Sequence, residues 1–86
     1  MDYLLPTQET AVEVKMARQS LTAGKLGEEL IVDIAKYQEH PKVRKLLCFV
    51  YDPDGLIPNP RDIENDLSKQ HDKLAVQVMI VPKVHP

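Results

Sequence analysis

The run "KLLCFVY" at residues 45–51 is almost continuously apolar, which is typical of a strand covered on both faces. On either side of it, at 23–39 and 60–71, apolar residues recur at helical spacing. Strands that alternate with helices in this way predict a mixed α/β sheet with helices packed on its faces. With 86 residues, of which 43% are apolar, the chain can form one domain with one modest core.

Three more strands complete the expected sheet. The segments 2–5 and 10–17 are predicted to form a hairpin around the proline-led turn "PTQE". A last strand is expected at 74–82, after a helix whose start is marked by Asn59 and Pro60. The order is β-β-α-β-α-β, with four strands and two helices. A right-handed crossover should make 10–17 parallel to the central strand 45–51, while the direction of the last strand stays open.

The stretch "AVEVKMAR" at 11–18 places charges within an otherwise apolar strand. Because strand side chains alternate between faces, Val12, Val14 and Met16 should point one way. Glu13 and Lys15 should point the other way. We expect the apolar face to pack in the core, so that the charged face requires a separate explanation.

The hairpin register suggests that explanation. If residues 6–9 form the loop, Leu5 faces Thr10 and Asp2 faces Glu13, and opposed residues share a face. Two carboxylates side by side destabilise an antiparallel pair unless a cation lies between them. Hard oxygen ligands suit Mg²⁺ or Mn²⁺, whose bound water can attack a phosphate while the Lys15 ammonium orients it or offsets developing charge.

Asp2 followed by "EVK" at 13–15 resembles the D…ExK signature of the PD-(D/E)XK nuclease superfamily. The segments "KLGEELIVDIAKYQEHP" and "KLLCFVYDPDGLIPNPRDIENDL" are similar to the C-terminal part of DpnII/MboI-type restriction endonuclease domains, which commonly end bacterial defence proteins. The resemblance implies a restriction-endonuclease-like core that cleaves DNA phosphodiesters. It also implies that Asp2 and Glu13 bind the metal and that Lys15 assists hydrolysis.

The chain departs from the superfamily pattern at two places. Members normally have a helix and a strand before the aspartate, so the resemblance implies that residues 1–86 form the C-terminal part of a nuclease domain without them. Some relatives also carry Gln-x-x-x-Tyr on the helix after the lysine, where this chain has Asp33 and Tyr37. With Glu29 one turn before Asp33, these side chains could reach the metal-binding edge of the sheet.

Each candidate also has a simpler interpretation. Glu13 and Lys15 could form an ordinary surface ion pair, Glu29 and Asp33 could belong to a solvated helix face, and Tyr37 could pack the helix on the sheet. Arg18 is the basic residue nearest the expected active face and a candidate for phosphate contact. Other basic residues could contact phosphates or be surface charge: Lys25, Lys36, Lys42, Arg44 and Lys45.

The leading hypothesis is a Mg²⁺-dependent, restriction endonuclease-like DNA hydrolase with DNA as its partner. The alternatives are an inactive nuclease-derived fragment that serves as an oligomerisation or interaction module, and an unrelated small binding protein. Cys48 is expected to be a buried free thiol, and the absence of a leader or a long apolar run favours a cytoplasmic protein without membrane contact. An open sheet edge at 2–5 predicts a homodimer.

Overall fold

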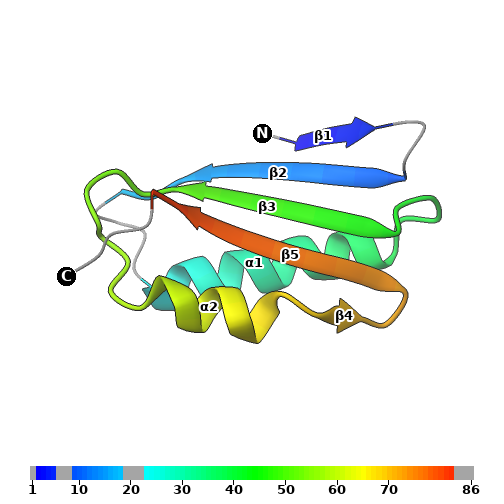
Figure 1. Ribbon diagram of the computed structural model, residues 1–86. Helices are drawn as coiled ribbons and strands as arrows, with labels where there is room; N and C mark the ends of the chain where they lie inside the picture. Colours follow the sequence, from blue (N-terminus) through cyan, green and yellow to red (C-terminus); the bar gives the residue numbers. More distant parts are fainter. Residues whose placement is uncertain (1, 6–8, 19–22, 83–86) are drawn as a thin grey trace.

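The computed structural model describes residues 2–5, 9–18 and 23–82, with the backbone alone for 2–5 and 23. The elements, in chain order, are β1 (Asp2–Leu5), β2 (Thr10–Met16), α1 (Ala23–Gln38), β3 (Lys45–Tyr51), α2 (Pro60–Leu67), β4 (Gln70–His71) and β5 (Leu74–Val81) (Figure 1). The sheet order is β1-β2-β3-β5-β4. This arrangement confirms the predicted α/β class, with β3 at the centre.

The strand directions complete the topology. β2, β3 and β5 are parallel to one another, which confirms the expected crossover and gives the last long strand its direction. β1 is antiparallel to β2, in the predicted register: Leu5 pairs with Thr10 and Asp2 with Glu13. The carboxyl ends of three parallel strands therefore lie at one edge of the sheet.

The second helix is shorter than predicted, because the chain leaves helical geometry at Ser68 rather than continuing to His71. The two-residue strand β4 follows, and a turn with Asp72 at φ 58° leads into β5. Ser68 is used elsewhere: its hydroxyl accepts a hydrogen bond from the backbone N–H of Val78, at 2.9 Å. The apolar spacing of this helix does not reveal that its end is fixed by such a contact with a strand.

α2 also covers the outer edge of β5. A carboxylate oxygen of Glu64 accepts a hydrogen bond from the N–H of Ile80 at 2.7 Å, and the carbonyl of Lys69 accepts one from Val76 at 3.0 Å. Together with Ser68, these groups satisfy alternate backbone donors along β5. The other edge of the sheet is formed by β1.

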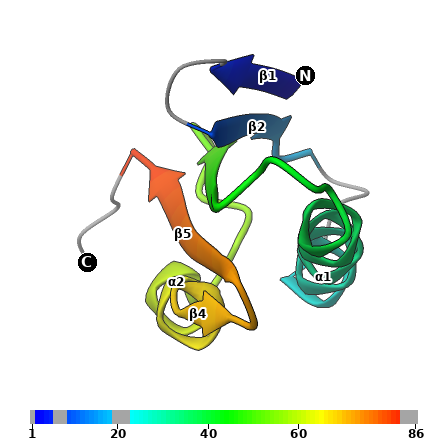
Figure 2. The ribbon, with the colours of Figure 1, turned by 90° about the vertical axis from the view of Figure 1, so that its right-hand side faces the viewer.

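The core lies between α1, α2 and one face of the sheet (Figure 2). Its fully buried members include Leu26 and Leu30 of α1 together with Leu46 of β3. Ile63 and Leu67 of α2 pack against the same cluster. Both helices therefore pack on the same face of the sheet.

This layering corrects two expectations about the sheet. Val14 and Met16 were predicted to lie in the core, yet they are 40% and 60% exposed, whereas Glu13 is 6% exposed. β3 was predicted to be covered on both faces, yet Tyr51 is 47% exposed and Phe49 is half-buried. The alternation of faces was right, but its assignment was reversed, because the charged side chains of β2 face α1 and form ion pairs with it.

Candidate functional site

Four charged side chains meet where β2 faces α1. The ammonium of Lys15 lies 2.8 Å from a carboxylate oxygen of Asp33, 3.3 Å from one of Glu29 and 3.8 Å from one of Glu13. Lys15 and Asp33 are each only 15% exposed, while Glu29 is 47% exposed. One ammonium is thus surrounded by three carboxylates in a partly desolvated position.

Two regular elements produce this arrangement. Glu13 and Lys15 are two positions apart on β2, so both side chains project toward α1. Glu29 and Asp33 are four positions apart on α1, so they lie one above the other on the helix face directed at β2. All four residues were expected near the site from the sequence, and the structure brings them together.

Three other residues were expected near the site from the sequence: Asp2, Tyr37 and Arg18. The backbone of Asp2 is paired with Glu13, as predicted, while its side chain lies outside the described residues. Tyr37 is 7% exposed and belongs to the core, which agrees with the packing interpretation. Arg18 is exposed just after β2, past the end of the strand that carries Lys15.

The surroundings of Lys15 determine its protonation. Burial lowers the pKa of the ammonium, but the carboxylate of Asp33 raises it, with further contributions from Glu29 and Glu13, and the net pKa lies above 10.5. Lys15 is therefore a cation at neutral pH in this arrangement. It can offset negative charge or orient a water molecule, but it holds its proton too firmly to act as a base.

A thiol lies beside Glu13 on the neighbouring strand of the sheet. Cys48 of β3 pairs with Glu13 in the parallel register and is 1% exposed, as expected for a buried free cysteine. Burial raises the pKa of the thiol to about 12, and the nearby carboxylates of Asp33 and Glu13 add to the shift. At neutral pH Cys48 is therefore a neutral, unreactive group next to Glu13.

The donor set at Glu13 suits a hard divalent cation. Carboxylate oxygens are the ligands that Mg²⁺ prefers, and Mg²⁺ is held by as few as one or two carboxylates while keeping several waters. Glu13 is buried, and β1 places Asp2 opposite it. Within the described side chains, no group of three or more His, Cys, Asp or Glu residues is arranged to hold a metal ion. Glu13 and Asp2 are thus the candidate pair of ligands in the described part of the chain.

A shallow hollow of about 300 Å³ gives access to the cluster from the side of α1; its lining residues are Lys15, Glu28, Glu29, Val32 and Asp33. Glu28 and Val32 were not predicted as site residues. Val32 is 65% exposed, and an apolar residue on the solvent side of an amphipathic helix is the sequence signal that could have identified it. A phosphate that approaches Lys15 must pass this exposed part of α1.

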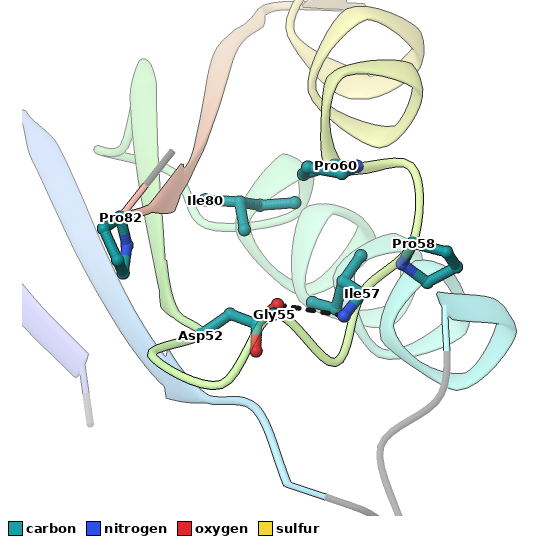
Figure 3. Close-up of a pocket in the computed structure, with 7 residues that line it drawn as sticks. All are labelled: Asp52, Gly55, Ile57, Pro58, Pro60, Ile80 and Pro82. Carbon is teal, nitrogen blue, oxygen red and sulfur yellow. Dashed lines mark hydrogen bonds between the residues drawn. The ribbon is translucent and has the colours of Figure 1, made fainter. Parts of the chain in front are cut away.

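A second hollow, of about 260 Å³, lies where β3 and β5 end (Figure 3); it is lined by Asp52, Gly55, Ile57, Pro58, Pro60, Ile80 and Pro82. Its one carboxylate is fully used: the two oxygens of Asp52 accept hydrogen bonds from the N–H groups of Leu56 and Ile57, at 2.8 and 2.9 Å. Asp52 therefore fixes the turn after β3. The hollow is otherwise apolar, so the Lys15 cluster remains the candidate site.

Comparison with known proteins identifies the family of the chain. The family model described as REase_DpnII-MboI matches residues 1–83. Neither the curated proteins nor the solved structures gave a match. No helix in the described ranges is long and apolar enough to cross a membrane. The match includes β1, β2 and α1 with all their site residues, and the chain therefore belongs to the DpnII-MboI restriction endonuclease family.

Proposed function

We propose that this chain hydrolyses DNA phosphodiester bonds with Mg²⁺, which Mn²⁺ can replace, through Asp2, Glu13 and Lys15. Restriction endonucleases cleave DNA and generally use divalent metal ions. The observation that carries the proposal is the Lys15 ammonium 3.8 Å from Glu13, on the strand that pairs Glu13 with Asp2. An anionic ligand pair beside a fixed cation can promote phosphodiester hydrolysis through a metal-bound water and through charge stabilisation.

Each residue has a distinct role in the proposed reaction. Glu13 and Asp2 hold the metal, which when bound supplies an acidified water and offsets negative charge on the phosphate. Lys15 stays protonated and stabilises the charge that develops on the phosphoryl oxygens. Asp33 and Glu29 hold the Lys15 side chain in place through their ion pairs. Arg18 contacts a phosphate beyond the end of β2.

Nicking of supercoiled plasmid in the presence of Mg²⁺ tests the activity. We expect slow, weakly specific nicking that Glu13→Gln and Lys15→Ala abolish. Lys45→Ala is the matched control, because it removes an exposed lysine at the opposite end of the sheet. Robust Mg²⁺-dependent cleavage that persists in Lys15→Ala would refute the role of Lys15.

Metal binding has its own measurement. If Asp2 and Glu13 share the metal, Mn²⁺ should broaden the NMR signals of both residues, because a paramagnetic ion affects nearby nuclei. Glu13→Gln should remove the effect. Broadening that survives the substitution would place the metal elsewhere.

The open face of the sheet favours a second candidate, in which the domain does not cleave DNA and serves as an oligomerisation or interaction module. Val14, Met16 and Tyr51 are large apolar residues that none of the described helices covers. An exposed apolar patch of this kind marks surfaces that associate. Absence of nicking together with concentration-dependent association would support this candidate.

A further inference from the structure

We infer that Lys25 and Lys36 of α1 bind backbone phosphates of DNA on either side of the bond to be cleaved. This inference deepens the proposed function and rests on it. It assigns a DNA-contacting role to a helix face outside the reacting cluster. The argument uses the position of the two lysines on α1, the charge between them and the direction from which a phosphate can reach Lys15.

The approach of the substrate is set by the orientation of β2. Lys15 and Glu13 project from the sheet toward α1, and the hollow that opens onto Lys15 is lined by the α1 residues Glu28, Glu29, Val32 and Asp33. The face of the sheet that bears Val14 and Met16 points the opposite way. A phosphodiester must therefore reach Lys15 alongside α1, and the neighbouring phosphates of the same strand follow the helix.

The two basic residues of α1 lie along this path. In "AGKLGEELIVDIAKYQ", Lys25 and Lys36 are separated by eleven positions, which at 3.6 residues per turn places them only about 20° apart around the helix. Glu29 and Val32 fall on the same stripe, between them. Lys25 and Lys36 are both exposed. The lysines thus lie before and after the hollow, on the helix face that lines it.

The contact of Lys36 with Tyr37 also directs its side chain toward the side of the helix that bears the site. Its ammonium lies 4.7 Å from the centre of the Tyr37 ring, and Tyr37 is one turn after Asp33, on the side of α1 that meets the sheet. The Lys36 side chain therefore leans toward the face occupied by the site. A cation held against an aromatic ring keeps its attraction for a phosphate while it loses part of its conformational freedom.

The charge balance makes such cations necessary. Four carboxylates, from Glu13, Glu28, Glu29 and Asp33, surround or line the hollow, against the single ammonium of Lys15. DNA carries one negative charge about every 1.7 Å of its axis and is repelled by such a surface. Positive groups at both ends of the acidic stripe draw the flanking phosphates in and leave the centre for the metal and the scissile phosphate.

The spacing suits the length of a DNA strand. A rise of 1.5 Å per residue separates Lys25 from Lys36 by about 16 Å along the helix axis. Successive phosphates of one strand are about 3.4 Å apart along the duplex axis and wind around it, so a span of this length covers more than one of them. Glu29, next to Lys15, falls within this span. The two lysines can thus hold phosphates on both sides of the reacting one.

Binding of a short fluorescent duplex, without divalent metal so that no cleavage occurs, tests the inference. Lys25→Gln and Lys36→Gln should each lower the slope of log affinity against log salt by about 0.9. The ratio of wild-type affinity to variant affinity should therefore fall about 3.5-fold when salt rises from 50 to 200 mM, because a slope difference of about 0.9 acts over a fourfold change in salt. Lys36→Arg should keep the wild-type slope, and circular dichroism should show unchanged folding in all variants.

Arg61→Gln and Lys69→Gln are the matched controls, because each removes one exposed positive charge on or after α2. They should leave the slope unchanged. An equal decrease of the salt slope in all four variants would show that overall charge, not position, determines binding, and would overturn the inference. An unchanged slope in Lys25→Gln and Lys36→Gln would overturn it as well. If the wild type nicks plasmid while the α1 variants behave like the controls, the proposed function stands and only this inference fails. If the wild type does not bind the duplex at all, both fail.

Discussion

The ammonium of Lys15 lies 2.8 Å from a carboxylate oxygen of Asp33, so an ion pair joins the second strand of the sheet to the middle of α1. The pair is largely shielded from solvent, since each side chain is 15% exposed. It holds Lys15 near Glu13 instead of allowing its flexible side chain to extend into water. The geometry of the candidate site therefore depends on the packing of α1 against β2.

Asp33→Asn should weaken this link. The amide keeps the shape of the carboxylate and loses its charge, so the pKa of Lys15 should fall and the free energy of unfolding should drop by about 1–3 kcal/mol. A ¹³C NMR titration of the Lys15 side chain and urea unfolding measure the two effects. Glu28→Gln is the control, because Glu28 lines the same hollow but is not among the three carboxylates around Lys15. An unchanged Lys15 pKa in Asp33→Asn would show that Glu29 and Glu13 are sufficient to keep the pKa of Lys15 raised.

Cys48 should resist thiol reagents in the folded protein. Its pKa is raised to about 12 and it is 1% exposed, so almost no accessible thiolate exists at pH 8. Modification by a disulfide reagent should become fast only in denaturant. Rapid labelling of the native protein would contradict the burial of β3.

The same shift makes stability depend on alkaline pH. Above pH 9 the unfolded thiol loses its proton while the folded thiol keeps it up to about pH 12, so the folded state is progressively disfavoured as pH rises through this window. One such group lowers the free energy of unfolding by at most about 1.4 kcal/mol per pH unit. Lys15, whose pKa is also raised, loses its stabilising charge in the alkaline range as well. Cys48→Ala should reduce the slope measured by urea unfolding between pH 9 and pH 11, and an identical slope would exclude the thiol as its source.

The covered edge of β5 gives a stability prediction that is independent of catalysis. Ser68→Ala should leave the N–H of Val78 without its hydroxyl partner and cost about 1–3 kcal/mol. Hydrogen exchange at Val78 should accelerate more than at the other amides of β5. Asn65→Ala, on the exposed side of α2, serves as the reference substitution and should change stability little. Equal effects of the two substitutions would mean that water replaces the Ser68 hydroxyl.

The other edge leads to a prediction about assembly. We propose that the protein forms a two-fold homodimer, because β1 ends the sheet and an edge strand presents backbone groups that can pair with a second chain. Sedimentation equilibrium at micromolar concentration should give the mass of a dimer. A stable monomer whose amides are protected throughout residues 2–5 would contradict the proposal, since it would show that this edge is satisfied within one chain.

Most of the fold follows from periodicity, because long elements such as β3 and α1 carry an unambiguous pattern. The register of β1 and β2 was also predictable, since the assignment of residues 6–9 to the loop aligns Asp2 with Glu13, as observed. The sequence did not predict correctly which face of β2 is buried. Val12, Val14 and Met16 are more apolar than Glu13 and Lys15, and only the carboxylates of α1, which are remote in sequence, make the charged face the inner one. In the same way, the end of α2 is determined by the contact between Ser68 and β5 rather than by helix propensity.

The crossover that carries α1 also determines when the candidate site forms during folding. β1 and β2 are close in sequence and can pair early, but Thr10 of β2 pairs with Lys45 only after the chain has closed a loop that contains all of α1. Non-local parallel pairing of this kind slows folding, because the entropy of loop closure is lost before the contacts form. Residues of α1 pack in the same core as residues of β3, so we expect the position of Asp33 relative to Lys15 to be fixed only when this pairing is complete. A newly synthesised chain therefore contains the charged strand before it contains the assembled cluster, so the proposed activity and native stability should appear together in refolding experiments.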